Sequence, residues 1–219
     1  MRDEVKLRVD GYRKERKALG FVDSNLWIGR PPTPGFVSGY DLPSLRRRME
    51  RYGIQGGVVS HFACIDYGQS WGNESVLKAV AGTGLWASLV LTPELFENDE
   101  RGRAELSDAI TQGARMARLY PRDHHFSLAS WCSGAMLQAL SDSRMPLMLR
   151  HTQVSWEDIG RICREYPRLP LIIEAVEQKI LYHNRRLYPL MKRYPGLRLE
   201  LHNFVAYLAV EDVVRRFGA

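Results

Sequence analysis

The sequence contains little cysteine, and none of it has the spacing of a metal or redox motif. Its 219 residues include three cysteines, Cys64, Cys132 and Cys163, which lie far apart and form no Cys-x-x-Cys pair. This argues against a disulfide framework and a structural zinc site, and it fits a reducing cytoplasm. No neighbouring base would activate any of the three thiols, so we expect all three to pack in the core.

Long apolar runs are also missing. No run reaches the roughly 18 residues of a membrane span, and the first residues, MRDEVK, lack the apolar centre of a signal peptide. We therefore expect a cytoplasmic protein with no membrane partner.

Charge of one sign is not concentrated anywhere in the chain. Lysine and arginine total 31 against 25 aspartate and glutamate, which gives a net charge of +6. The basic residues are dispersed along helical patterns, which is typical of solvated helix faces. No nucleic-acid motif accompanies them, so we expect no nucleic-acid partner. Hydrophobic residues make up 45% and charged residues 26%, as in a globular chain with one good-sized core.

Short apolar stretches alternate with helical patterns along the chain. The expected strands lie at about 21–28, 57–60, 85–91, 114–119, 146–151, 170–176 and 197–201. The expected helices lie at about 45–52, 73–80, 101–112, 132–141, 155–166, 183–193 and 210–217, and residues 61–71 are expected to form a long loop. Strands that are apolar on both faces indicate a parallel sheet covered by helices.

This rhythm predicts an α/β fold, a TIM-type (β/α) barrel that is incomplete, with about seven strands and strand eight missing. Residues 1–20 are expected to form an N-terminal arm or helix, and residues 21–219 the barrel. An unclosed barrel leaves open strand edges. Either the chain is a fragment, or another segment or subunit covers them, and we expect a homo-oligomer or a partner chain.

Polar residues interrupt the first apolar stretch. Asp23, Asn25 and Trp27 share one side of the expected strand, because side chains alternate with period two. Buried polar groups need partners, so these residues are either satisfied in the core or used in chemistry.

Other candidates lie at the ends of later strands. His61 follows strand two and could transfer protons. Arg150 could hold a carboxylate, and Glu174 ends an apolar strand, where a buried carboxylate needs a partner such as Arg150. Glu200 and His202 alternate at the end of strand seven and share one face. The pair His124-His125 is expected to serve the loop structure rather than the chemistry.

Several blocks together resemble the amidohydrolase-related family of metal-dependent TIM-barrel hydrolases and decarboxylases. They are residues 22–29 (VDSNLWIG), 113–121 (GARMARLYP), 144–152 (RMPLMLRHT), 166–173 (YPRLPLII), 187–197 (LYPLMKRYPGL) and 213–219 (VVRRFGA). The resemblance covers roughly residues 20–219 and is specific as a set. It implies a barrel with its site at the C-terminal mouth.

The departures from the family pattern concern its metal. Asn25 and Trp27 stand where the family has two histidine ligands, and neither side chain is a good zinc ligand. The fifth-strand ligand falls at Arg150 or, with a slip of one residue, at His151. No histidine occupies the sixth-strand position, and the family's strand-eight aspartate would lie beyond Ala219. We therefore expect a degenerate metal site and no cofactor, with a divalent metal such as zinc as the alternative.

The resemblance implies a hydrolase or decarboxylase that acts on a small organic acid or amide as its small-molecule substrate. The expected catalytic residues are Asp23, His61, His151 and Glu174, and the expected substrate-binding residues are Asn25, Arg150, Glu200 and His202. The alternative is a non-catalytic barrel subunit that binds small molecules or serves assembly. The missing histidines favour the alternative, and the polar residues at several strand ends favour the enzyme.

Overall fold

The computed structural model describes residues 2–31, 40–66, 68–175, 184–201, 204 and 207–218. The chain divides into two compact units, Met1–Leu89 with Ala109–Arg115, and Val90–Asp108 with Met116–Ala219. We refer to them as unit 1 and unit 2. No helix in the described residues is long and apolar enough to cross a membrane.

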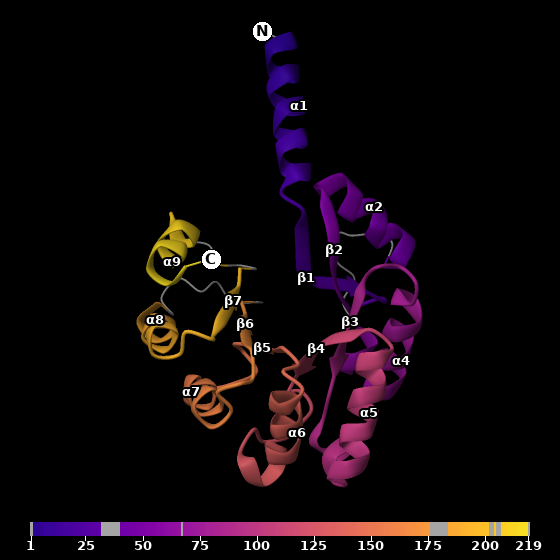
Figure 1. Cartoon of the computed structure of the whole chain (residues 1–219), viewed down its shortest axis with the longest axis vertical. Helices are drawn as coiled ribbons and strands as arrows, with labels where there is room; N and C mark the ends of the chain where they lie inside the picture. The colour runs from indigo at the N-terminus through magenta and orange to yellow at the C-terminus, as the bar shows by residue number, and fades with distance from the viewer. Residues whose placement is uncertain are drawn as a thin grey trace. The chain divides into compact units, whose positions relative to one another are not determined.

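The elements alternate along the chain as the sequence predicts (Figure 1). The first half contains α1 (Arg2–Ala18), β1 (Phe21–Ile28), α2 (Leu42–Tyr52), β2 (Ile54–His61), α3 (Ala63–Asp66), α4 (Gln69–Val80), β3 (Trp86–Val90), the 3₁₀ helix η1 (Pro93–Phe96) and α5 (Asp99–Thr111). The second half contains β4 (Ala114–Leu119), α6 (Ser130–Asp142), β5 (Leu147–Arg150), α7 (Trp156–Glu165), β6 (Leu171–Glu174), α8 (Asn184–Arg193), β7 (Arg198–Glu200) and α9 (Ala209–Phe217).

The seven described strands lie in one sheet in the order β1-β2-β3-β4-β5-β6-β7, and the strand pairs whose registers are resolved are parallel. Parallel strands need crossover connections, and helices provide them here. This is the predicted fold class, an incomplete TIM-type α/β barrel.

Two helix starts follow directly from local sequence. Asp41 caps α2, because its carboxylate accepts the Ser44 N–H at 2.7 Å. Ser155 caps α7 in the same way and accepts the Asp158 N–H at 3.0 Å. Such caps satisfy backbone donors that a helix leaves unpaired at its first turn.

The predicted loop over residues 61–71 is wrong. The segment contains α3, and α4 begins at Gln69. The reason is close packing at Gly72, where a Cβ would lie only 2.7 Å from the Cys64 backbone nitrogen. Only glycine allows the first turn of α4 to lie so near α3, and the pattern of apolar residues does not show this contact.

Unit 1 packs its core on one face of its strands. Leu26 and Ile28 of β1 and Val59 of β2 lie in an apolar cluster with α2 and α4 residues such as Met49 and Val76. Because side chains alternate along a strand, Trp27 lies on the opposite face from Leu26 and Ile28.

The strands of unit 2 also have two different faces. One face is apolar and buried, with Ala117, Leu119, Leu147, Leu149, Leu171 and Ile173. Helices α6 and α7 supply further buried side chains, including Met136 and Ile159. The alternate positions on β4, β5 and β6 include Arg118, Arg150 and Glu174, so this second face carries charge.

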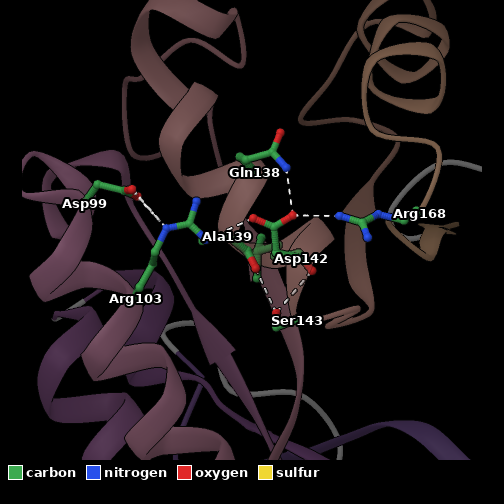
Figure 2. A network of polar contacts seen from close by, with 8 residues as sticks. Asp99, Arg103, Gln138, Ala139, Asp142, Ser143 and Arg168 are labelled. Carbon is green, nitrogen blue, oxygen red and sulfur yellow. Dashed lines mark hydrogen bonds and ion pairs between the residues drawn. The ribbon is translucent and has the colours of Figure 1, made fainter.

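An ion-pair network joins α5, α6 and the segment before β6 in unit 2 (Figure 2). Asp142 accepts hydrogen bonds from Gln138 at 2.8 Å, Arg103 at 3.0 Å and Arg168 at 2.8 Å. Arg103 also donates to Asp99 at 2.9 Å. The Gln138 and Arg103 hydrogen bonds lower the pKa of Asp142. Asp142 ends α6 and leads to the start of β5, so this network lies at the amino ends of the strands, where barrel residues serve stability.

Candidate functional site

The candidate site lies at the carboxyl ends of β4, β5 and β6 in unit 2. Arg150 ends β5 and is in register with Glu174, which ends β6, and Glu174 is in register with Glu200 of β7. Residues in register on parallel strands point to the same face, so these three side chains form a row. Tyr120 directly follows β4, whose Leu119 is in register with Leu149. In barrels of this type the carboxyl ends of the strands carry the chemistry.

Two arginines share one carboxylate oxygen at the centre of this row. Arg118 Nη1 lies 2.9 Å and Arg150 Nε 3.1 Å from Glu174 Oε2. The side chains of Arg118 and Glu174 are each 1% exposed, and that of Arg150 is 13% exposed. Charges are tolerated at such burial only when they are paired and hydrogen-bonded. Arg150 is the member of the cluster that reaches solvent.

Tyr120 packs against the accessible arginine. The Arg150 guanidinium carbon lies 5.0 Å from the centre of the Tyr120 ring, which is the arrangement of a cation–π contact. Burial raises the pKa of the Tyr120 hydroxyl, and the nearby Arg118 and Arg150 charges oppose that rise. The neutral phenol ring therefore restricts the orientation of the Arg150 side chain.

His151 lies beside the same strand end and is buried. Its Nδ1 is 3.2 Å from the carbonyl oxygen of Glu174, which also accepts the His151 backbone N–H at 3.1 Å. A carbonyl oxygen only accepts, so Nδ1 carries the proton in this contact. In the neutral ring the basic lone pair is then on Nε2. The sequence left open whether residue 150 or residue 151 holds the functional position of the fifth strand. In the structure Arg150, and not His151, is in register with Glu174.

The loops after β4 and β5 are tied together close to these residues. Gln153 Nε2 donates to Asp123 Oδ2 at 2.8 Å, and the Asp123 N–H donates to Gln153 Oε1 at 3.2 Å. Gln153 is buried, and the ring centroids of His124 and Tyr120 are 5.7 Å apart. The loop that contains the His124-His125 pair is thus fixed by these contacts.

The predicted residues of β1 satisfy one another locally in unit 1. The Asn25 N–H donates to Asp23 Oδ1 at 2.8 Å, and Trp27 Nε1 donates to Asn25 Oδ1 at 2.7 Å. The Trp27 ring stacks on Phe62 with a centroid distance of 4.6 Å. The oxygen that Asn25 would offer to a metal therefore accepts the indole N–H, and a tryptophan cannot ligate. The expectation of a degenerate metal site at these two positions stays a prediction.

His61 has its own contacts in unit 1. Its Nδ1 accepts the Ala63 N–H at 3.1 Å, and its ring meets Trp71 of α4 edge to face at 5.4 Å. His61 is in register with Ile28, which lies in the apolar core. Burial lowers the pKa of the imidazole. The catalytic role of His61 stays a prediction.

The structure thus brings together three of the predicted residues, Arg150, His151 and Glu174, with Glu200 next in the row. Asp23, Asn25 and His61 belong to unit 1. His202 lies outside the described residues. Among the described residues, no group of three or more histidine, cysteine, aspartate or glutamate side chains could hold a metal ion.

Sequence reasoning missed Arg118 and Tyr120. A usable signal was present, because Arg118 stands between Ala117 and Leu119 in a strand whose other inner positions are apolar. A charge in such a strand needs a buried partner. The partner could not be named, since Glu174 is 56 residues away in the sequence.

Comparison of the whole chain with known proteins gives structural matches. No family model matches the sequence, and no curated protein matches it. A protein assigned as a 2-pyrone-4,6-dicarboxylic acid hydrolase from Pseudomonas putida matches with a TM-score of 0.62 and 14% identity, over 90% of this chain and 78% of that one. Amidohydrolase 2 from Bifidobacterium longum subsp. infantis matches with a TM-score of 0.61 and 16% identity, over 90% and 79% of the two chains. The chain shares the TIM-type α/β barrel fold of these two proteins. At these identities the likeness establishes the fold, as the resemblance in sequence predicted, and leaves the reaction to the site.

Proposed function

We propose that this chain is a hydrolase of the amidohydrolase type that binds a small organic acid through Arg150. The observation that carries the proposal is the cluster in which two guanidinium groups surround one carboxylate at the strand ends. A guanidinium has five N–H donors, and its planar fork matches a carboxylate. Tyr120 supports the Arg150 side chain from its ring face.

In the proposed reaction, His151 acts as the general base. Nε2 takes a proton from water while the water oxygen bonds to the acyl carbon of an ester or amide. The bond from that carbon to its oxygen or nitrogen leaving group then breaks, and the proton passes from His151 to the leaving group. The contact of Nδ1 with the Glu174 carbonyl holds the imidazole in the required tautomer. Glu174 is occupied by two arginines, so we assign it to positioning rather than to proton transfer.

The first substrate to test is 2-pyrone-4,6-dicarboxylate, because a protein with the same fold is assigned as its hydrolase. It offers two carboxylates and a ring ester. Loss of the pyrone absorbance measures turnover, chromatography of the ring-opened acid confirms the product, and calorimetry measures binding.

Two variants test the assigned roles. Arg150→Met should weaken binding by about 30-fold or more, as expected for truncation of a charged hydrogen bond. His151→Gln should keep binding within about threefold and lower turnover by about 10²-fold or more, the usual contribution of a general base. Arg164→Met on the exposed surface of α7 is the matched control and should change neither. Unchanged binding in Arg150→Met would show that the site is wrong.

The alternative function is small-molecule binding without catalysis. The contacts among Asp23, Asn25 and Trp27 favour it, because they use these groups within the strand. Binding without turnover, lost in Arg150→Met, would establish this alternative. Metal analysis of the purified protein adds a second test, since a stoichiometric divalent metal would overturn our interpretation of Asn25 and Trp27. A homo-oligomer or partner chain that covers open strand edges stays a prediction.

A further inference from the structure

We propose that Arg118 is a positioning residue that neutralises Glu174 and thereby keeps the charge of Arg150 available for the anionic ligand. The inference rests on the proposed function of Arg150 and assigns a task to a residue that does not itself meet the ligand. Three observations support it: the place of Arg118 in the sheet, the oxygen that it shares with Arg150, and the sum of charges on this face.

Arg118 lies one layer deeper in the sheet than Arg150. It is in register with Met148, two residues before Arg150 on β5, which corresponds to about 7 Å along a strand. Its side chain is 1% exposed, against 13% for Arg150. A ligand that enters from the carboxyl ends of the strands therefore meets Arg150 first, and Arg118 acts through Glu174.

Both arginines bind the same oxygen, Glu174 Oε2. Without Arg118, the carboxylate would have Arg150 as its remaining guanidinium partner in this cluster. The pair of Glu174 and Arg150 would then be neutral, and Arg150 would be drawn toward Glu174 rather than toward a ligand. Arg118 prevents this because its positive charge, one layer deeper in the sheet, compensates the negative charge of Glu174.

The charge of the neighbouring Glu200 increases the effect that loss of Arg118 has on binding of an anionic ligand. Arg118, Arg150, Glu174 and the neighbouring Glu200 sum to zero, and Glu200 lies one strand farther from Arg150 than Glu174 does. Loss of Arg118 leaves the other three groups with a net charge of −1. A local negative charge repels a carboxylate, and the effect is strong where burial lowers the dielectric constant.

The test measures the affinity for 2-pyrone-4,6-dicarboxylate by calorimetry in four proteins: wild type, Arg118→Met, Arg118→Lys and the double variant Arg118→Met with Glu174→Gln. We expect Arg118→Met to bind at least about tenfold more weakly. Arg118→Lys keeps the charge and should stay within about threefold of wild type. The double variant removes one positive and one negative charge, so it should recover to within about threefold of wild type although it lacks both side chains.

Recovery in the double variant is the result that a purely structural role of Arg118 would not give. If Arg118→Met alone does not fold, the comparison of wild type with Arg118→Lys and the double variant decides the question, because removal of both members of a buried pair is better tolerated than removal of one. Weak binding by a folded double variant would overturn the inference, and so would wild-type affinity in Arg118→Met.

Failure of the proposed function gives a different pattern. If the wild type does not bind the probe, or if Arg150→Met binds it as well as the wild type does, the Arg150 site is wrong and this inference is overturned with it. If Arg150→Met loses binding while Arg118→Met retains it, the function stands and the inference alone is overturned.

Discussion

Replacement of Glu174 by glutamine should destabilise the protein strongly, because it removes the one charge that the buried Arg118 and the partly buried Arg150 share. Gln keeps the size and one acceptor oxygen of the side chain, so the packing is preserved and the charge alone changes. The contacts at 2.9 Å and 3.1 Å are both made to Oε2. At an effective dielectric constant of about 20, two unit charges about 3 Å apart attract by roughly 5–6 kcal/mol.

This value is the Coulomb attraction alone, and desolvation of the buried charges offsets part of it. Loss of one partner of a buried pair typically costs about 3–5 kcal/mol, because the remaining charge is left uncompensated. We expect a loss of this size for Glu174→Gln, toward the upper end because two arginines are affected. For a chain of this length, it corresponds to a fall in Tm of about 6–20 °C.

Urea unfolding followed by circular dichroism at pH 7 measures this loss. The matched control is Glu97→Gln, the same chemical change at an exposed position of unit 2, which should shift the unfolding free energy by less than about 0.5 kcal/mol. The loss at Glu174 should persist in high salt, since buried pairs are screened less than exposed ones. A loss below about 1 kcal/mol, or one equal to that of the control, would refute the reasoning.

Three further predictions concern the rest of the chain. Asp142→Asn should lower the Tm at pH 7. The difference in Tm from wild type should shrink as pH falls through and below 3.8, the ordinary pKa of the carboxyl group. The reason is that the ion pairs of Asp142, which lower its pKa, stabilise the protein only while the carboxylate is charged. The pKa of His61 is depressed, so the unfolded chain binds more protons than the folded chain below pH 6.5, and stability should fall as pH drops below this value. His61→Phe should remove this fall from a plot of Tm against pH. An unchanged fall in the variant would contradict the prediction. Gly57→Ala should destabilise the protein by about 1–3 kcal/mol or more, since a Cβ there would lie 2.5 Å from the Asp23 carbonyl oxygen. Gly196→Ala has open space around it and serves as the control in the same urea experiment.

Part of the candidate site could be predicted because it consists of residues at the ends of consecutive strands. Glu174 at the end of an apolar strand requires a cationic partner, and Arg150 at the end of the preceding strand is a natural candidate. The structure confirms this pair at 3.1 Å. Equivalent ends of consecutive parallel strands lie side by side, so position along each strand was enough to bring these two residues together. Their roles toward a ligand stay predictions.

For His61, the position along the strand left the face of the sheet open. Its expected place at the mouth of the barrel stays a prediction, and the structure shows its ring against Trp71 of α4. A shift of one residue in register moves a side chain to the other face of a sheet. The expected strand at residues 57–60 has only four residues, too few to fix that choice.

By itself, the sequence determined the fold class. Strands apolar on both faces, helices between them and caps at Asp41 and Ser155 are local patterns, and each constrains the chain within a few turns. The tertiary structure alone decided that Arg118 meets Glu174 and that Gly72 lets α4 pack against α3. These contacts depend on register and close approach between segments distant in sequence. A single chain pattern does not encode such distances, because they arise only when the strands pair and the helices pack.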